Sequence, residues 1–427
     1  MAKARVLIVG GEGRGHALGW KLAQSPEVAK VYFAPGNGGT SQVGENINIG
    51  VDDFSTLAIF ARDKKIDLTV VSPEQPLAGG IADHFEAQGL AIFGPSAAAA
   101  KIEASKVHSA DFMKRHKIPH PRSFTVNTIE EARVFINTHS PKDYVIKADG
   151  LAGGKGVFVP KSKAEAEESI SDIMEAKVFG EAGRQIVFQK RLKGQEVSAF
   201  ALSDGQNIVM LPFFQDHKQI NDGDNGPNTG GMGAYSPLPF MNTDLANRIQ
   251  SEIMQAAIDG MRADGTPYKG VLFAGLFITE GGDPKVIEFN CRFGDPECQT
   301  MMMLLEGDLY PLLKAAAERD LKGQDIKVKP GASATIMLAS EGYPGKYATG
   351  QEIKGLDAVK DPNVSVFHSG TKAEKGKLVS AGGRVLGITA YGPTMKAALE
   401  LAYKQIGPSG VHFKDMHYRK DIGHRVL

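Results

Sequence analysis

Short apolar runs alternate with longer amphipathic stretches over the first hundred positions of the chain. Residues 5–9 and 68–71 are almost entirely apolar, whereas 55–64 repeats its apolar positions at helical spacing. Strands buried on both faces show such runs, and their alternation with helices indicates a parallel sheet covered on both sides. We therefore expect a doubly wound parallel α/β domain over residues 1–104.

Two further apolar stretches near the middle of the chain predict an antiparallel hairpin. They cover 271–278 and 285–291, and the glycine-rich sequence 281–283 between them favours a turn. Because side chains alternate along a strand, consecutive residues of the second stretch face opposite sides. This alternation assigns Val286, Glu288 and Asn290 to one face, and Ile287, Phe289 and Cys291 to the core.

The polar face of that second strand carries candidate metal ligands. Glu288 and Asn290 would present a carboxylate and an amide oxygen side by side, which suits Mg²⁺. Arg292 follows where the strand ends, and a guanidinium there is suited to bind a phosphate or a carboxylate. An edge strand with solvated polar residues and a turn at 294–296 accounts for the same pattern, so this motif alone leaves both interpretations open.

A glycine-rich segment around a lysine follows the predicted strand 144–147. Glycines on both sides of Lys155 favour a flexible flap whose N–H groups and ammonium would cover phosphates. The segment is not a Walker A loop, because Gly156 takes the place of Ser or Thr and a strand follows instead of a helix. An ordinary glycine-rich hairpin with surface lysines is the structural alternative.

The remaining pattern divides the chain into several α/β and α+β units. The polar segment 219–236 has no periodicity, and irregular stretches of this length in compact enzymes are usually functional. Strand patterns resume after 331 without a catalytic cluster, and we expect Lys372 and Arg384 there to be solvated. A chain of 427 residues is too long for one core. The expected domains are 1–104, 105–330 with a mobile lid at about 120–190, and 331–427.

Composition narrows the class of protein. Lys and Arg together number 49, as do Asp and Glu, so net charge does not favour nucleic acid or an anionic membrane as a partner. The two cysteines, Cys291 and Cys298, argue against a disulfide framework and for a reducing compartment. No run is long and apolar enough to span a membrane, and the N-terminus lacks the shape of a signal peptide. We expect a cytoplasmic protein.

Glycines at positions 10–15 directly follow the first predicted strand. A strand, a glycine-rich turn and a helix N-terminus make an anion site. A dinucleotide-dependent dehydrogenase is one candidate, but the spacing is not a clean G-x-G-x-x-G and no acidic residue closes the second strand at 31–33. A phosphate-bearing substrate fits the loop as well as a cofactor does.

Four stretches carry a resemblance that extends over the whole chain. They are 145–157, 215–218, 226–237 and 288–297. By these stretches the sequence resembles the glycinamide ribonucleotide synthetases, or phosphoribosylamine–glycine ligases, a family of ATP-grasp enzymes of purine biosynthesis. The resemblance implies a central ATP-grasp fold of two subdomains and a small C-terminal α+β domain. It also implies a monomer that uses ATP and Mg²⁺ (or Mn²⁺) to join glycine to 5-phosphoribosylamine through glycyl phosphate.

The resemblance further implies roles for individual residues. Lys147, Lys155, Arg292 and Asp295 would be catalytic, and Glu288 and Asn290 would ligate the metal ion. The nucleotide would contact Lys106, Lys147, Gly153, Gly154, Lys155, Gly156, Gln189, Lys190, Leu192 and Glu196. The other two substrates would contact Gly11, Gly13, Arg14, Asn37, Glu74, Asp216, His217, Lys218, Asn228, Gly230, Gly231 and Arg292.

Two departures from the family pattern bear on this assignment. Gly15 takes the place of a usual glutamate in the N-terminal loop, and Gln189 with Lys190 replaces a usually acidic hinge. Three alternatives stay open: another ATP-grasp carboxylate–amine ligase, a biotin-dependent carboxylase that uses bicarbonate, and a nucleotide sensor that binds ATP without turnover. Within the family interpretation, backbone at Gly230 and Gly231 would wall a pocket that admits glycine and excludes alanine.

Overall fold

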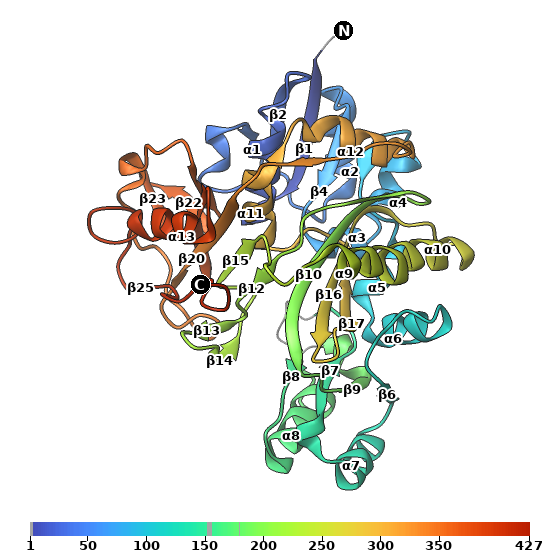
Figure 1. Cartoon of the computed structure of the whole chain (residues 1–427). Coiled ribbons are helices and arrows are strands. Elements are labelled where there is room, and N and C mark those ends of the chain that lie inside the picture. The colour runs from blue at the N-terminus through green and yellow to red at the C-terminus, as the bar shows by residue number, and fades with distance from the viewer. Residues whose placement is uncertain (1–2, 152–155, 179) are drawn as a thin grey trace.

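The computed structural model describes residues 3–151, 156–178 and 180–427. Its N-terminal unit contains strands β1 (Ala4–Gly10), β2 (Val28–Pro35), β3 (Glu45–Asn46), β4 (Leu68–Val71) and β5 (Ile92–Phe93). Its helices are α1 (Gly13–Leu22), α2 (Phe54–Asp63), α3 (Glu74–Ala78), α4 (Ile81–Glu86) and α5 (Ala97–Ala104). The sheet is parallel in the order β3-β2-β1-β4-β5 (Figure 1).

Both faces of this sheet are buried, as its apolar strands predict. Val6 and Ile8 of β1 share a core cluster with residues of α1. Leu7 and Val9, on the opposite face, share another cluster with residues of α2 and α4. The predicted doubly wound α/β fold is therefore confirmed, and it brings the β1–α1 turn to the carboxyl edge of the sheet, where such folds bind ligands.

A small lobe follows and projects from the rest of the molecule at the bottom of Figure 1. Helix α6 (Lys106–Arg115) leads into it, and it contains β6 (Ser123–Val126), α7 (Ile129–Thr138), β7 (Tyr144–Ala148), β8 (Val157–Phe158), α8 (Lys163–Ile170) and β9 (Ile186–Lys190). The antiparallel sheet has the order β6-β9-β7-β8. Phe135, Ile146 and Phe188 belong to a core cluster confined to this lobe, so the lobe packs largely on itself.

A second antiparallel sheet lies beside the lobe, in the order β11-β10-β16-β17. Its strands are β10 (Gly194–Asp204), β11 (Ile208–Met210), β16 (Lys269–Thr279) and β17 (Pro284–Asn290). Helices α9 (Thr243–Arg248) and α10 (Ala256–Ala263) are joined by a π-helical segment, Ile249–Gln255. The helices α11 (Glu297–Leu304) and α12 (Leu309–Glu318) come after β17.

The predicted hairpin of β16 and β17 is confirmed, but the predicted alternation along β17 is wrong at one point. Gly275 pairs with Glu288 while the next residue, Leu276, pairs with Val286, so Ile287 is an unpaired bulge residue. A bulge shifts the side chains that follow it to the other face. Val286 therefore joins Phe289 in the core, and Ile287 lies half-buried next to Glu288, contrary to the expectation from strict alternation.

The third sheet combines strands from the middle and the end of the chain. Its main path is β12-β15-β20-β24-β21, with β25 paired to β20. The strands are β12 (Gln215–Asp216), β15 (Gly233–Ser236), β20 (Ala332–Ser340), β21 (Val364–His368), β24 (Arg384–Gly392) and β25 (Met416–His417), and helix α13 (Met395–Lys404) packs on them. β15 pairs with β20, so the strands of the C-terminal part share a sheet with strands from the middle of the chain.

Three short strand pairs are also present in the described structure. The segment predicted to be irregular, 219–236, instead contains a hairpin of β13 (Gln219–Asn221) and β14 (Asn225–Asn228), followed by the strand β15. The other short strands are β18 (Leu305–Glu306), β19 (Lys327–Val328), β22 (Thr371–Glu374) and β23 (Lys377–Ser380). Among the described residues, no helix has both the length and the apolar character that a membrane span requires.

Candidate active site

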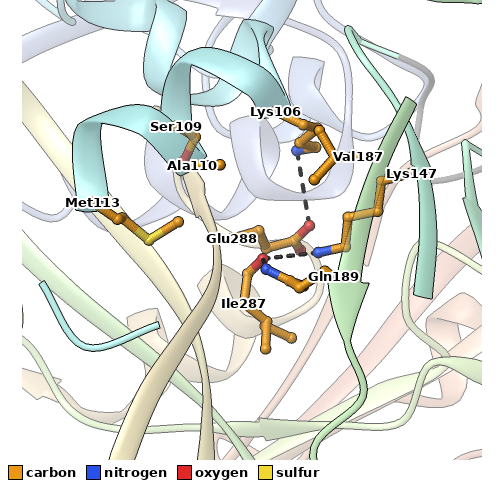
Figure 2. Close-up of a pocket in the computed structure, with 9 residues that line it drawn as sticks. All are labelled: Lys106, Ser109, Ala110, Met113, Lys147, Val187, Gln189, Ile287 and Glu288. Carbon is orange, nitrogen blue, oxygen red and sulfur yellow. Dashed lines mark hydrogen bonds and ion pairs between the residues drawn. The ribbon is translucent and has the colours of Figure 1, made fainter. Parts of the chain in front are cut away.

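A pocket lies between helix α6 and strands β7, β9 and β17. Figure 2 shows side chains from these four elements converging on it. Lys106, at the first position of α6, follows the capping residue Ser105, whose Oγ accepts the His108 N–H at 3.0 Å. The lining residues are Lys106, Ser109, Ala110, Met113, Lys147, Val187, Gln189, Ile287 and Glu288.

Four of these residues were assigned to the site from the sequence, and the other five were missed. The four are Lys106, Lys147, Gln189 and Glu288. Ser109, Ala110 and Met113 follow Lys106 at intervals of three and four residues, so they share one face of α6. This spacing was a usable signal once Lys106 had been assigned to a site. Val187 and Ile287 had no such signal, because their exposure to the pocket depends on how β9 and β17 approach each other.

Three charged groups meet in the pocket. Lys106 Nζ lies 3.9 Å from a carboxylate oxygen of Glu288. Lys147 Nζ donates to the carbonyl oxygen of Ile287 at 2.8 Å, and burial lowers the pKa of Lys147 to about 8 despite the nearby Glu288 carboxylate. Burial favours neutral Glu288, but the charges of Lys106 and Lys147 outweigh it and lower the pKa of Glu288 to about 2.

The residues that replace the usual acidic hinge have different surroundings. Gln189 is buried, and its Nε2 donates to the same Ile287 carbonyl at 3.3 Å. Lys190 is exposed, and its ammonium pairs with Asp143 at 2.9 Å, outside the pocket. The bulged Ile287 thus presents a carbonyl that holds both Lys147 and Gln189, and only Gln189 of the two hinge residues lines the pocket with its side chain.

A second group of charges lies where β10 and β12 meet. Lys218 donates to both carboxylate oxygens of Asp216, at 3.0 and 3.1 Å, and also pairs with Glu196. Burial favours neutral Lys218, but these carboxylates raise its pKa well above the ordinary value. The ammonium therefore joins Glu196, predicted to contact nucleotide, to Asp216, predicted to contact the other substrates.

The end of β17 leads into a third group, formed with the N-terminal unit. Arg14 donates to Glu74 at 2.9 Å, and Arg292 lies 3.5 Å from the same Glu74 oxygen. Arg292 also donates to the Asn290 amide oxygen at 3.1 Å and pairs with Glu103 at 3.3 Å. Burial raises the pKa of Glu74, but the two arginines lower it to about 2 overall. The structure therefore brings together residues predicted to contact substrate and metal.

Asp295 connects this group to the C-terminal strands. Its carboxylate accepts the Arg14 N–H at 3.1 Å and a side-chain N–H of Gln299 at 2.9 Å, and it lies 3.3 Å from the guanidinium of Arg384. Arg384 is on β24, and the expectation that it is a solvated surface residue is wrong. Tertiary pairing of β24 with β20 places it against the site, whereas Lys372 is exposed and pairs with Glu374.

The glycine turn after β1 closes the N-terminal side of the site. Asn37 donates to the Gly11 carbonyl at 2.8 Å and to the His368 carbonyl at 2.7 Å. A Cβ at Gly11 would lie 2.5 Å from the carbonyl oxygen of Gly36, so only glycine fits there without a shift. A Cβ at Gly13 would lie 3.5 Å from Asp295. The turn is therefore next to the Asp295 group, as its predicted role requires.

Some predicted residues are placed elsewhere or lie outside the described part. Gly153, Gly154 and Lys155 are not among the described residues, whereas the Gly156 carbonyl accepts the Ala148 N–H at 2.9 Å. Leu192 and Asn228 are half-buried, the first in the stretch before β10 and the second at the end of β14. His217 is fully buried with both ring nitrogens bonded to protein, which favours a positioning role over substrate contact.

Most of the chain is similar to a known protein family. Residues 4–103, 104–298 and 333–425 match the N domain, the ATP-grasp (A) domain and the C domain of phosphoribosylglycinamide synthetase. The chain belongs to the phosphoribosylglycinamide synthetase family. This is the family, under its other name, whose resemblance the motifs indicated, and that prediction is confirmed.

Relatives within this synthetase family include single-function and multifunctional proteins. Phosphoribosylamine–glycine ligase of Vibrio vulnificus is 46% identical, over 99% of this chain and 98% of the relative. The trifunctional purine biosynthetic protein adenosine-3 of Gallus gallus is 48% identical, over 99% of this chain. This chain spans only 42% of the chicken protein and 53% of a bifunctional protein of Schizosaccharomyces pombe.

Solved structures agree with the family's fold. A crystal structure of phosphoribosylamine–glycine ligase from Thermotoga maritima has a TM-score of 0.86 and 34% identity, over 98% of this chain and 100% of that one. A biotin carboxylase domain from Hydrogenobacter thermophilus has a TM-score of 0.75 at 13% identity, over 98% of this chain and 92% of that one. The similarity to the biotin carboxylase domain concerns the fold alone. The predicted synthetase fold, with an N-terminal parallel sheet, an ATP-grasp domain and a C-terminal domain, is confirmed.

Proposed function

We propose that this chain ligates glycine to 5-phosphoribosylamine at the expense of ATP, the reaction for which its Vibrio and Thermotoga relatives are named. One observation carries the proposal. Strand β17 carries Glu288 in the pocket and ends at Asn290, and Arg292 just beyond it belongs to the group of charges shared with the N-terminal unit. Phosphoryl transfer depends on positioning and charge neutralisation, and this short stretch places a nucleotide pocket next to an anion-binding group.

In this proposal ATP occupies the pocket between α6 and β17. Met113 and Val187 supply apolar surface for the base, and Glu196 binds the ribose. Lys106 and Lys147 contact the phosphates, and the low pKa of Lys147 is raised again when an anionic phosphate replaces solvent beside it. The remaining nucleotide contacts are the backbone of Gln189, Lys190 and Leu192, and the flap residues Gly153, Gly154, Lys155 and Gly156.

A divalent metal ion fits Glu288 and Asn290. Lys106 and Lys147 keep Glu288 ionised at neutral pH, and Asn290 adds an amide oxygen, so the set has the hard oxygen donors that Mg²⁺ and Mn²⁺ accept. When bound there, the ion neutralises charge on the transferring phosphoryl group. Asn290 Oδ1 is already fixed by Arg292, which orients the amide before a ligand arrives.

The proposed reaction has two steps. The γ-phosphoryl group passes to a carboxylate oxygen of glycine, which releases ADP and forms glycyl phosphate. The amine of phosphoribosylamine then attacks the acyl carbon, phosphate leaves, and the nitrogen loses a proton. The chain acts by positioning and charge neutralisation, without a covalent protein intermediate. Arg292 holds the reacting carboxylate, Asp295 lines the same end of the site beside Arg384, and closure of the flap excludes water from the acyl phosphate.

Substrate positions follow from the groups around Asp295. Backbone at Gly230 and Gly231 borders the glycine site, and Asp216 and Lys218 line its other side. The phosphate of phosphoribosylamine binds the glycine turn after β1, where backbone N–H groups precede α1. The residues proposed for this second substrate are Gly11, Gly13, Arg14, Asn37 and Glu74, with Asn228 at the edge of the glycine site.

The test is ADP release with each co-substrate omitted in turn. We expect release to require glycine, phosphoribosylamine and a divalent cation together, and we expect no replacement of glycine by bicarbonate. Turnover with bicarbonate would support a carboxylase instead. Tight ATP binding without any substrate-dependent ADP release would support a nucleotide sensor and contradict the ligase.

Two further properties belong to the proposal. The only cysteines, Cys291 and Cys298, are both buried and unpaired, which supports a reducing, cytoplasmic location. We propose that the chain acts as a monomer, which size-exclusion chromatography with light scattering tests directly. A stable dimer at assay concentration would contradict this part alone.

A further inference from the structure

The segment 419–425, near the C-terminal end of the described chain, packs against the β13–β14 hairpin and the strand before it. Arg419 is completely buried, and its guanidinium pairs with Asp224 at 2.8 Å and with Asp421 at 2.8 Å. Asp421 in turn accepts the backbone N–H of Gly223 at 2.8 Å. The two segments are about two hundred positions apart in sequence, so only the tertiary fold brings them together.

His217 is the point at which this segment approaches the site. Its Nε2 accepts the Gly423 N–H at 3.1 Å, so the ring proton is on Nδ1, which faces Asp224 at 3.4 Å. The neighbouring residues in sequence, Asp216 and Lys218, carry the charged group that includes Glu196. The buried ring thus anchors a stretch whose adjacent side chains point into the site.

Arg425 makes a direct connection to the same stretch. Its Nη1 donates to the backbone carbonyl of Asp216 at 3.1 Å, while its Nε and Nη2 donate to Asp224 at 3.2 and 2.7 Å. The hydrogen bond from His217 and the ion pairs with Arg425 and Arg419 lower the pKa of Asp224 far below its ordinary value. Asp224 is therefore ionised at neutral pH, and its carboxylate pairs with both arginines.

A metal ion is a competing explanation for part of this cluster. His217, Asp224 and His424 are close enough in space to share one ion. However, Nε2 of His217 is bonded to Gly423, its Nδ1 carries the proton, and both oxygens of Asp224 are bonded to arginines. No ligand atom of the first two residues is free, so the cluster is a set of ion pairs and hydrogen bonds.

We propose that residues 419–425 form a positioning segment of the active site. Arg425, together with Arg419 through Asp224, fixes the backbone at Asp216 and the ring of His217, and so keeps Asp216 and Lys218 directed at Glu196. This inference rests on the proposed function, because it assigns Asp216 and Lys218 to the glycine side of the site. Glu196 itself lies on β10, which pairs along its length with β16, so its position does not depend on the segment.

The test compares Arg425→Ala with the unaltered full-length chain below the melting temperature of both. The variant loses the hydrogen bond to the Asp216 carbonyl and the ion pair with Asp224, which together hold the backbone beside the site. Its kcat/KM for glycine should therefore be about tenfold lower. The affinity for a non-hydrolysable ATP analogue should not change, because Glu196 stays in place. Arg425→Lys should recover part of the loss, since an ammonium retains the charge but not the fork that reaches both acceptors.

A second variant and a matched control keep the result interpretable. Asp224→Asn should give the same selective loss with glycine while leaving the Arg425 side chain intact. Arg248→Ala is the control, because Arg248 also pairs with two carboxylates, Glu252 and Asp283, and donates to a backbone carbonyl, yet it touches none of the site residues. It should leave glycine kinetics unchanged.

Two results would overturn the inference. One is unchanged kcat/KM for glycine in both Arg425→Ala and Asp224→Asn. The other is a loss that affects ATP binding and glycine use equally and follows the folded fraction in a melting curve, which would mean a purely structural role. If the unaltered chain releases no ADP with glycine and phosphoribosylamine, the proposed function fails, and this inference fails with it.

Discussion

The guanidinium of Arg384 lies 3.3 Å from the carboxylate of Asp295, across the boundary between the C-terminal strands and the ATP-grasp domain. The same guanidinium donates to the carbonyls of Gly230, Gly231 and Asp295, at 2.6, 3.2 and 2.5 Å. One residue of β24 therefore holds two backbone turns and a carboxylate that the sequence assigned to the site. The C domain takes part in shaping the site even though it supplies no nucleotide contact in our proposal.

Removing this connection should reduce activity more than stability. We expect Arg384→Ala to lower kcat/KM for glycine by about ten- to a hundredfold, because a partly buried charged donor to four acceptors is lost. Steady-state kinetics and a melting curve measure the two effects. Lys372→Ala is the control, since Lys372 is an exposed residue of the same domain that pairs only with Glu374. Equal kinetics for the two variants would contradict the role of Arg384.

The metal assignment predicts a charge-specific effect at Glu288. Glu288→Gln should lower turnover far more than stability and raise the Mg²⁺ concentration needed for half-maximal activity, because a ligand charge is removed. Titration of ADP release with Mg²⁺ measures this. Glu280→Gln, at an exposed position of the same hairpin, is the control. Wild-type activity of Glu288→Gln at limiting Mg²⁺ would show that the assignment is wrong.

The surroundings of Gly231 predict that an alanine at this position destabilises the fold by more than backbone strain alone would. Its φ is +111°, and a Cβ there would lie 2.6 Å from Cδ of Pro296. Gly231→Ala should therefore lower the melting temperature more than Gly282→Ala, whose φ is +80° but whose Cβ would meet nothing. Strain at such a φ costs about 1–3 kcal/mol at either position. Equal shifts for the two variants would mean that Pro296 moves aside freely.

Because Gly231→Ala perturbs the fold, the glycine-pocket hypothesis is best tested on the unaltered chain. We expect ADP release with glycine and little with L-alanine, since Arg384 holds the Gly230 and Gly231 carbonyls and the backbone has little room to accept a methyl group. The measurement is kcat/KM for each amino acid with phosphoribosylamine present. Comparable values would contradict a pocket walled by this backbone.

The buried carboxyl group of Glu297 should make the stability of the folded chain depend on pH. Burial and the nearby Asp216 raise the pKa of Glu297 from its ordinary 4.5 to about 7. Between these values the folded chain holds a proton that the unfolded chain has released, so stability falls as pH rises through this window. Glu297→Gln can still accept the hydrogen bond from the Ser198 hydroxyl. Its melting temperature relative to wild type should rise between about pH 5 and pH 8, the range in which the proton is lost from wild type.

The control is Glu306→Gln, which removes an exposed carboxylate from β18, the short strand that follows the helix of Glu297. Both variants are melted beside wild type over the same pH range. A difference for Glu297→Gln that does not vary with pH would show that Glu297 is already ionised in the folded chain at pH 5.

Much of the local structure was predictable because it depends on neighbours in the chain. The apolar run at 68–71 is β4, and the two stretches predicted to form a hairpin, 271–278 and 285–291, correspond to β16 and β17. The pocket residues Lys106, Lys147, Gln189 and Glu288 were all identified in advance. Periodicity, capping and glycine turns act over a few residues, so the sequence contains their signals directly.

Only the tertiary structure shows contacts between residues that are far apart in sequence, and only it shows where strand pairing is irregular. The bulge at Ile287 arises from the register of β17 against β16, and it turns Val286 into the core and exposes a carbonyl to Lys147. Arg384 reaches Asp295 because β24 and β15 both pair with β20. By itself the sequence determined the family, the strands and helices, and the charged pocket residues. Register and sheet order decided the rest, because they depend on the packing of whole sheets, which no short window of sequence specifies.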